Sequence, residues 1–440
     1  MIRFFYNLLY PLGLLLFLPG QISKLLRRGN YRHKFGQRFG VYDRDVQARL
    51  ASHRCTWIHA VSVGEVAIAL KLSAKLSELD PEFFCVITTT TTTGFAFAAW
   101  EAGERMEVLY SPLDFWPIMR RAYAVIRPIR VILVEAEVWP NLAAEARGRG
   151  LPLALVNARL SQRSERRFRR FLFLVEPTFR CLDLVCVQEP EDIERWIALR
   201  VPRERIQNVG SIKYDPAETK VNPELPLQVL RAFGVGGDRP VLFGGSTHAG
   251  EEEVLGEIFQ RLRADFPAFT LIIAPRHVER AGEIRAQLMR LGLDVSMRSE
   301  AETARMSPPD CILLDTTGEL QNWYAVATIV FVGKSLTARG GQNPVEPILA
   351  DKPVLFGPHM ENFSALAEAL VANEGAIQIR DPNSLQEKIA WLLRDRGAAL
   401  RLVANAQAVL ARHSGATART ADLVMKLESR RDAIGDAIRK

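Results

Sequence analysis

Carboxylates follow apolar segments at two places in the first half of the chain. Glu65 lies in AVSVGEV, directly after one apolar run, and Glu135 and Glu137 lie in VEAEVWPNL, at the end of another. Parallel sheets bind ligands beyond the carboxyl ends of their strands, so these side chains are placed to meet a ligand. A carboxylate there could act as a general base. Each could instead neutralise the N-terminus of the following helix, and the spacing alone leaves both interpretations open.

Basic residues hold comparable positions. Lys213 lies in VGSIKYD near the end of the first half, and Arg276 lies in APRHVER after an apolar run. An arginine can bind phosphate through two parallel N–H groups, and a lysine offers a compact positive charge. In FGGSTHAGEEE, Gly244 and Gly245 follow a predicted strand and precede a predicted helix, where backbone N–H groups can face an anion. A solvated surface charge remains the alternative for each basic residue.

The segment GGQNPVEP at residues 340–347 has the features of a nucleoside site. Gly340 and Gly341 allow a tight turn, and Pro344 favours the start of a helix. Glu346 then falls in the first turn of that helix, where its carboxylate could accept hydrogen bonds from ribose hydroxyl groups. A capped helix near the surface is the alternative.

Residues 157–173, NARLSQRSERRFRRFLF, predict a basic amphipathic helix. Arg166, Arg169 and Arg170 would share one helix face, and phenylalanines lie between and after them. This pattern is typical of a helix that rests on an anionic lipid surface with its aromatic rings inserted, so we expect these arginines at the membrane or acceptor surface. Nucleic-acid binding and an ordinary solvated helix face are the alternatives.

Apolar runs and helical patterns alternate along both halves of the chain. Continuous apolar runs bounded by Gly, Pro or Asp predict buried parallel strands, and their alternation with helices predicts two α/β-layered domains. The predicted strands cover residues 57–61, 84–88, 131–135, 153–157 and 184–188, and then 240–246, 271–276, 311–315, 329–333 and 353–357.

The 440 residues suffice for two domains, and 48% of them are hydrophobic, which is ample for two cores. Prolines and glycines without strong periodicity predict a linker at residues 216–239. We therefore expect an N-terminal domain at residues 29–215 and a C-terminal domain at residues 240–440, which ends in a charged helix from about residue 416.

An uncharged apolar stretch lies near the N-terminus. Residues 4–19 read FFYNLLYPLGLLLFLP, and Lys24, Arg27 and Arg28 follow. The stretch is short for a membrane span, which needs about 20 residues, so a tilted or interfacial anchor is the alternative to a spanning helix. We expect residues 1–28 to anchor the chain to a membrane, and the positive charges predict that the rest stays cytoplasmic.

The formal net charge of +7 favours anionic partners such as nucleotides, phosphorylated lipids or an acidic membrane face. Five cysteines without a CxxC pair predict buried thiols in a reducing compartment. No HxxxH pair or similar metal-binding spacing occurs, so we expect no metal and no cofactor.

Nine segments occur in a characteristic order: HAVSVGE, VEAEVWPNL, NARLS, VGSIKYD, STHAGEEE, APRHVER, DTTGEL, FVGKSL and GGQNPVEP. From about residue 5 to residue 420 the chain resembles the Kdo (3-deoxy-D-manno-oct-2-ulosonic acid) transferases of lipopolysaccharide biosynthesis. The resemblance implies a GT-B fold, with two Rossmann-like domains facing a central cleft, and inverting chemistry without an essential metal. It also implies CMP-Kdo as donor, a phosphorylated lipid A precursor (a tetraacyldisaccharide bisphosphate) as acceptor, and a place at the cytoplasmic face of a bacterial inner membrane.

The resemblance implies roles for individual residues. Glu65 matches the catalytic base of the family, and Glu135 and Lys213 match positions that stabilise the transition state. The implied CMP-Kdo contacts are Pro275, Arg276, Thr317, Gly318, Glu319, Asn343, Pro344, Val345 and Glu346.

Two positions depart from the family's usual pattern. Many members have a histidine where this chain has Gln342, and a glycine where it has Lys334. Two other classes remain open: another GT-B nucleotide-sugar glycosyltransferase or epimerase, and a non-enzymatic protein that binds anionic lipid or nucleic acid. The second class would leave the carboxylates at several strand ends unexplained. For a Kdo transferase we expect no nucleic-acid partner.

Overall fold

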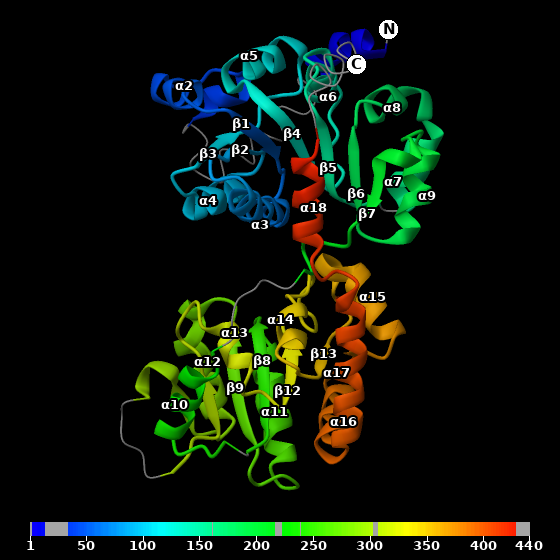
Figure 1. Cartoon of the computed structure of the whole chain (residues 1–440). Coiled ribbons are helices and arrows are strands. Elements are labelled where there is room, and N and C mark those ends of the chain that lie inside the picture. The colour runs from blue at the N-terminus through cyan, green and yellow to red at the C-terminus, as the bar shows by residue number, and fades with distance from the viewer. Residues whose placement is uncertain are drawn as a thin grey trace. The chain divides into compact units, whose positions relative to one another are not determined.

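The chain divides into two compact units (Figure 1). Unit 1 comprises Met1–Asp215 and His413–Lys440, and unit 2 comprises Pro216–Arg412. The structure is a computed structural model, and it describes residues 2–13, 34–160, 162–215, 222–237, 239–301 and 307–427.

Unit 1 is built on a parallel sheet. Within the described ranges it has seven strands, in the order β3-β2-β1-β4-β5-β6-β7. The strand order reverses between β1 and β4, as in a Rossmann-type sheet. The strands are β1 (Cys55–His59), β2 (Phe84–Thr89), β3 (Met106–Tyr110), β4 (Pro128–Val134), β5 (Leu153–Ala158), β6 (Leu184–Val187) and β7 (Ile206–Asn208).

Unit 2 repeats this plan. Its seven described strands lie in the order β10-β11-β9-β8-β12-β13-β14, all neighbours pair in parallel, and the order reverses between β8 and β12. The strands are β8 (Val241–Thr247), β9 (Thr270–Pro275), β10 (Val295–Met297), β11 (Cys311–Leu313), β12 (Ile329–Val332), β13 (Val354–Phe356) and β14 (Ile377–Gln378).

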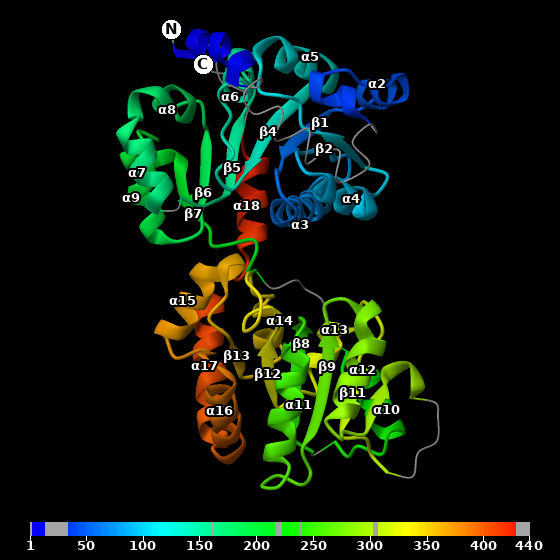
Figure 2. The ribbon, with the colours of Figure 1, turned by 180° about the vertical axis from the view of Figure 1, so that it is seen from behind.

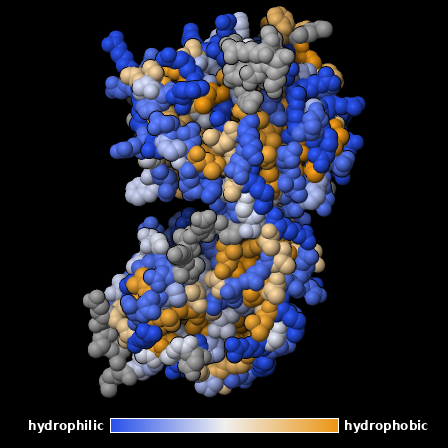
Figure 3. All heavy atoms as spheres, viewed as in Figure 1, coloured by the Kyte–Doolittle hydropathy of each residue, from blue (hydrophilic) through white to orange (hydrophobic). Residues whose placement is uncertain are grey.

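The apolar runs form strands because both faces of each sheet are covered, as Figures 1 and 2 show. Trp57 packs in one hydrophobic cluster of unit 1 and its neighbour Ile58 in another, since successive strand residues point to opposite faces. All ten predicted strands are present within a few residues. On the visible surface of both units, hydrophilic side chains are interspersed with hydrophobic ones (Figure 3).

The helices of unit 1 begin with residues 2–13, which are helical. The others are η1 (Phe35–Phe39), α2 (Arg44–Ala51), α3 (Val63–Leu79), α4 (Thr92–Glu101), α5 (Trp116–Ile126), α6 (Pro140–Gly148), α7 (Gln162–Arg170), α8 (Leu172–Phe179), α9 (Pro190–Ala198), η2 (Arg203–Arg205) and α18 (Ala416–Met425).

The helices of unit 2 include one where a linker was predicted. Residues 224–232 form α10 and bury Val229 and Leu230, so the predicted linker at residues 216–239 is wrong there. The others are α11 (Glu251–Leu262), η3 (Val278–Arg280), α12 (Ala281–Arg290), η4 (Arg298–Glu300), α13 (Leu320–Tyr324), α14 (Val345–Leu349), η5 (Glu361–Phe363), α15 (Ser364–Ala372), α16 (Pro382–Arg394) and α17 (Arg396–Ala411).

The last described helix, α18, belongs to unit 1 (Figure 2). Val424 packs in the same cluster as Ile58, and the Asp215 carboxylate accepts the backbone N–H groups of Gly415 and Thr417, each at 2.7 Å. The prediction of one domain at residues 240–440 is therefore wrong after Arg412. The predicted continuation of this helix, at residues 428–440, lies outside the described residues.

The predicted anchor at residues 1–28 is described only in part. Residues 2–13 are helical, whereas residues 14–28, which include Lys24, Arg27 and Arg28, lie outside the described ranges. Among the helices that the structure describes, none has the length and apolarity that a membrane crossing requires.

Candidate active site

Two predicted carboxylates lie where the strand order of the first sheet reverses. Glu65 is in the first turn of α3, after β1, and Glu135 directly follows β4, the neighbour of β1. Loops diverge at such a reversal, and Rossmann-type sheets bind ligands there. Glu135 has a φ of 61°, in the left-handed region that few residues other than glycine adopt. Strain of this kind is often found at functional sites.

Glu65 is buried, with 7% of its surface exposed. Its Oε2 accepts the Val61 N–H at 2.7 Å, and its Oε1 accepts the Ser62 hydroxyl at 2.9 Å, so it does help to cap α3. Burial raises the pKa of Glu65 to about 7, against these hydrogen bonds, and the charges of Glu135 and Glu137 raise it further. The capping role and the suitability as a base near neutral pH therefore occur in the same side chain.

Lys213 and Arg159 supply positive charge beside Glu135. Burial raises the pKa of Glu135, and the charges of Lys213 and Arg159 oppose this shift. Burial likewise lowers the pKa of Lys213, against the charge of Glu135. The structure thus brings the predicted pair Glu135 and Lys213 together. It adds Arg159, which the sequence had assigned to a lipid-facing helix and which instead lies just after β5.

Asn157 holds the loop that carries Lys213. Asn157 lies near the end of β5 and has a φ of 51°. Its Oδ1 accepts the Ser211 hydroxyl at 3.2 Å and the Ile212 N–H at 2.9 Å. The two residues before Lys213 are thereby fixed to the neighbouring strand end. Sequence reasoning missed this role, because Asn157 lay inside an apolar run.

Trp139 binds one of the carboxylates, and His59 packs against Trp139. Trp139 Nε1 donates to Glu137 Oε2 at 2.9 Å, and the His59 ring lies 4.5 Å from the Trp139 ring, edge to face. Burial lowers the pKa of His59 to about 4, so this imidazole is neutral at pH 7. An uncharged ring packs beside the acidic cluster without adding a counter-charge to it.

In unit 2 a buried carboxylate joins the loops at the β8–β12 reversal. Glu251, in the first turn of α11, is wholly buried. Among the described residues, four backbone N–H groups donate to its carboxylate at 2.7–3.0 Å: those of His248, Lys334, Ser335 and Leu336. Glu251 therefore fixes the loops after β8 and β12 to each other.

The segments DTTGEL and GGQNPVEP also meet in unit 2. Asn343 Nδ2 donates to Glu346 Oε1 at 2.9 Å, and Asn343 Oδ1 accepts the Val345 N–H. Burial raises the pKa of Glu346, against hydrogen bonds from Asn343 and from Gln321 of α13. Pro344 directly precedes α14, which has only five residues.

Glu319, beside the exposed Thr317 and Gly318, forms an ion pair with Arg298 at 2.9 Å. Its Oε2 also accepts the Trp323 indole N–H at 3.2 Å. Both predicted carboxylates of the CMP-Kdo set, Glu319 and Glu346, thus already have polar partners within unit 2.

Pro275 and Arg276 lie at the same edge of the second sheet. Pro275 ends β9 opposite Thr247 of β8, and the Arg276 N–H donates to the Thr247 carbonyl at 3.0 Å, while the Arg276 side chain is exposed. Gly244 and Gly245 do not follow the strand, as the motif suggested, but lie within β8. A Cβ at Gly245 would come within 2.5 Å of the Tyr324 hydroxyl, so these glycines permit close packing.

The chain is similar to known proteins over nearly its whole length. A 3-deoxy-D-manno-octulosonic acid transferase of Haemophilus influenzae is 32% identical over 427 residues, which are 96% of this chain and 98% of that protein. The chain belongs to the Kdo transferase family. The family model described as 3-Deoxy-D-manno-octulosonic-acid transferase matches residues 33–216, and the transferase of Bordetella pertussis is 34% identical, covering 88% of this chain and 90% of its own length. The protein is therefore a glycosyltransferase that transfers Kdo.

Solved structures establish the GT-B-like fold of this Kdo transferase. The UDP-GlcNAc 2-epimerase of Neisseria meningitidis superposes with a TM-score of 0.54 at 11% identity, covering 85% of this chain and 100% of that chain. The glycosyltransferase of kitacinnamycin superposes with a TM-score of 0.53 at 16% identity, covering 85% and 99%. Because an epimerase and a glycosyltransferase share the fold, the fold alone does not select between these activities.

The arginine-rich segment of the Kdo transferase is not the single helix predicted at residues 157–173. It comprises the end of β5, then α7 and α8, which separate at Phe171. Arg166, Arg169 and Arg170 are exposed, and Arg169 pairs with Glu165 at 3.1 Å. Phe168 packs against Phe179 and the core, so the expectation that it enters a bilayer is wrong.

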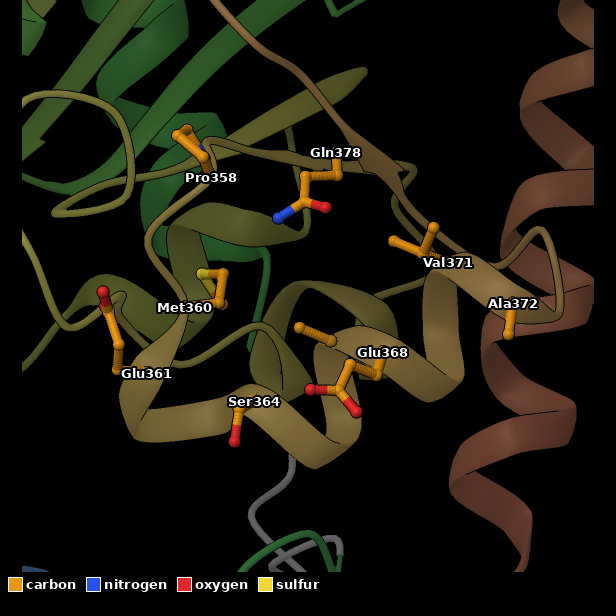
Figure 4. Close-up of a pocket in the computed structure, with 9 residues that line it drawn as sticks. Pro358, Met360, Glu361, Ser364, Glu368, Val371, Ala372 and Gln378 are labelled. Carbon is orange, nitrogen blue, oxygen red and sulfur yellow. The ribbon is translucent and has the colours of Figure 1, made fainter.

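A cavity of about 390 Å³ lies beside η5 and α15 in unit 2 (Figure 4). Met360, Glu368 and Gln378 are among its lining residues, and none of the lining residues is a predicted CMP-Kdo contact. Glu361, also in its lining, accepts the Gly340 N–H at 2.7 Å, so the cavity adjoins the GGQNP turn.

Proposed function

We propose that this Kdo transferase moves Kdo from CMP-Kdo to a hydroxyl group of a phosphorylated lipid A precursor, with inversion at the anomeric carbon. The observation that carries the proposal is the state of Glu65, a buried carboxylate with a pKa near 7 where the strand order reverses. A general base is most effective when its pKa lies near the operating pH. The matching order of the nine segments supports the choice of donor and acceptor.

In the proposed reaction, Glu65 takes the proton of the acceptor hydroxyl while the hydroxyl oxygen bonds to the anomeric carbon of Kdo. The bond from that carbon to the CMP phosphate oxygen breaks on the opposite face, and CMP leaves with the electron pair. Lys213 and Arg159, whose charges act on Glu135, would stabilise negative charge that develops on the reacting groups.

The proposal assigns the donor to unit 2. Arg276 is exposed at the carboxyl edge of the second sheet, where its guanidinium could bind the leaving phosphate. Glu346 and Glu319 would accept hydrogen bonds from the nucleoside. With arginine and lysine to balance the charge, the proposal includes no metal ion and no cofactor.

A donor comparison tests the proposal against the epimerase and other nucleotide-sugar activities. Purified protein is incubated with a lipid A precursor and either CMP-Kdo or UDP-N-acetylglucosamine, and products are identified by mass spectrometry. We expect a lipid product heavier by Kdo, with CMP released, only in the first incubation. A sugar transferred or epimerised only in the second incubation would contradict the proposal.

We further propose that the protein lies at the cytoplasmic face of a bacterial inner membrane. The polar side of the helix at residues 2–13 is bound to the rest of unit 1, through an Arg3–Glu145 ion pair at 2.7 Å and a Tyr6–Asp114 hydrogen bond at 3.0 Å. Its other side exposes apolar side chains, among them Phe4, Phe5, Leu8, Leu9 and Leu12. A helix bound on its polar side and apolar on its exposed side is suited to lie in a bilayer interface.

A further inference from the structure

Lys334 occupies the position in unit 2 at which a ligand is most expected. It follows Gly333, directly after β12, and the strand order reverses between β12 and β8. Ligands of open α/β sheets bind beyond the carboxyl ends of the strands at this reversal. Lys334 also has a φ of 56°, a left-handed conformation that costs a lysine free energy which a glycine would not lose.

The backbone of Lys334 is fixed on both sides. Its N–H donates to the wholly buried Glu251 carboxylate at 2.7 Å, and its carbonyl accepts the Gly341 N–H at 2.9 Å. The Gln342 N–H donates to the Gly333 carbonyl at 3.1 Å. Lys334 therefore lies beside the GGQNP turn, and its side chain starts from a defined point next to Gly340, where a Cβ would lie 3.4 Å from Lys334 Cε.

The charges around Lys334 leave its ammonium group without a carboxylate partner among the described residues. Two carboxylates that bind this part of the chain have other partners: Glu251 accepts backbone N–H groups, and Glu361 accepts the Gly340 N–H and lies 3.5 Å from His359. His248 directly follows β8, the strand beside β12. Burial lowers the pKa of His248, the charge of Glu251 opposes this, and the charge of Lys334 lowers it further.

A further positive charge lies along the same edge, on the exposed Arg276 after β9. The next residue is His277, whose ring lies 5.8 Å from the His248 ring. Basic side chains from three neighbouring strand ends thus gather where the sheet is expected to bind its ligand. Lys334 is half-buried, and a lysine in such a place can bind an anion through a charge-assisted hydrogen bond.

We propose that Lys334 binds an anionic group of the donor, either the phosphate of CMP or the carboxylate of Kdo. The proposal rests on CMP-Kdo being the donor. It makes Lys334 a donor-binding residue, and this binding would offset the free-energy cost of its left-handed backbone.

Four variants test the proposal by steady-state kinetics with CMP-Kdo and by CMP binding. Lys334→Gln removes the charge and keeps most of the length, Lys334→Gly removes the side chain and relaxes the backbone, and Lys334→Arg keeps the charge. Lys388→Gln alters an exposed lysine on α16 and serves as the control. We expect kcat/KM for CMP-Kdo to fall about 10-fold or more in the Gln and Gly variants, to change little in the Arg variant, and to stay unchanged in the control.

The binding measurement separates the two anions. CMP carries the phosphate but no Kdo carboxylate. A larger dissociation constant for CMP in Lys334→Gln than in wild type therefore assigns the contact to the phosphate. A dissociation constant for CMP that does not change assigns the contact to the carboxylate. The proposal is overturned if Lys334→Gln and Lys334→Gly both keep kcat/KM within about twofold of an active wild type. It is also overturned if Lys334→Gln loses activity and Lys334→Gly does not. If wild type binds CMP but does not turn over CMP-Kdo, the proposed function fails instead.

Discussion

Glu65 uses one carboxylate for two purposes. It caps the first turn of α3 through Val61 and Ser62. Its pKa is also raised to about 7, because burial and the charges of Glu135 and Glu137 oppose ionisation. The capping bonds also fix the direction of the carboxylate. A base that is held by its own helix keeps its orientation before substrate binds.

The first prediction concerns the pH dependence of transfer. Glu65 acts as a base only when ionised, and its pKa is raised to about 7, so kcat/KM should fall about tenfold for each pH unit below that value and level off above it. A pH–rate profile from about pH 5 to pH 9 measures this. A base with the ordinary pKa of a glutamate would give a profile that is flat down to about pH 5.

The sequence predicted some of these residues and missed others. Glu65, Glu135 and Lys213 were predictable because strand ends are readable from apolar runs, and carboxylates there are unusual. Asn157 and Arg159 were not, because their roles depend on tertiary contacts. Asn157 binds a loop more than fifty residues further along the chain, and Arg159 looked like part of the basic segment that follows it.

At the scale of elements, the helix at residues 2–13 carries the second prediction. Changing Leu8, Leu9 and Leu12 together to Gln should reduce sedimentation with lipid vesicles, because burial of each leucine contributes about 1.5–3 kcal/mol. The polar contacts of Arg3 and Tyr6 with unit 1 are kept, so the variant should fold normally. Leu400→Gln, at an exposed leucine of α17, is the control. Vesicle binding equal to that of wild type would exclude this face as the anchor.

The third prediction concerns α7. Changing Arg166, Arg169 and Arg170 to Gln should raise the KM for lipid acceptor about tenfold or more and leave the KM for CMP-Kdo nearly unchanged, because each basic residue near an anionic surface contributes about 1 kcal/mol. The Arg169–Glu165 ion pair makes Arg169 the weakest contributor. The defect should shrink as salt rises, since salt screens the wild-type attraction.

The control for α7 is the same triple change at three exposed arginines of unit 2, namely Arg290, Arg396 and Arg401. An equal loss in this control would mean that net charge alone is responsible. If the α7 variant lost donor affinity instead, the assignment of the acceptor to unit 1 would be wrong.

Elements were predicted well where packing is periodic and poorly where it is not. Central strands such as β1 and β8 are buried on both faces, and their apolar runs are unmistakable. The break between α7 and α8 escaped prediction, because Phe171 and the residues around it continue the helical pattern. Helix α10 escaped because prolines flank and interrupt it.

At the scale of the whole molecule, the reaction is expected to proceed without a metal ion. Transfer should survive treatment with EDTA, because Arg276, Lys213 and Lys334 can balance the charge of the donor and its leaving group. Activity is measured with and without chelator and after adding back Mg²⁺. A requirement for the ion that add-back restores would contradict the mechanism.

The two-domain plan could be predicted from the alternation of strands and helices. The C-terminal domain was predicted to begin at residue 240, whereas unit 2 begins at Pro216. The return of the chain to unit 1 could not be predicted. Helix α18 completes a hydrophobic cluster of unit 1 and is held by Asp215, a contact between residues two hundred positions apart. Nothing in the local pattern of α18 indicates which of two similar sheets it covers.

The most direct test of the account is the rate of Glu65→Gln. The change keeps the size of the side chain and its ability to accept the Val61 N–H, but removes its basicity. Kdo transfer from CMP-Kdo is measured at pH 8 for both proteins, with thermal unfolding and CMP binding as checks on the fold. The account predicts a rate about 10²–10⁴-fold lower with the fold and CMP affinity intact. Turnover close to that of wild type would show that another group removes the proton.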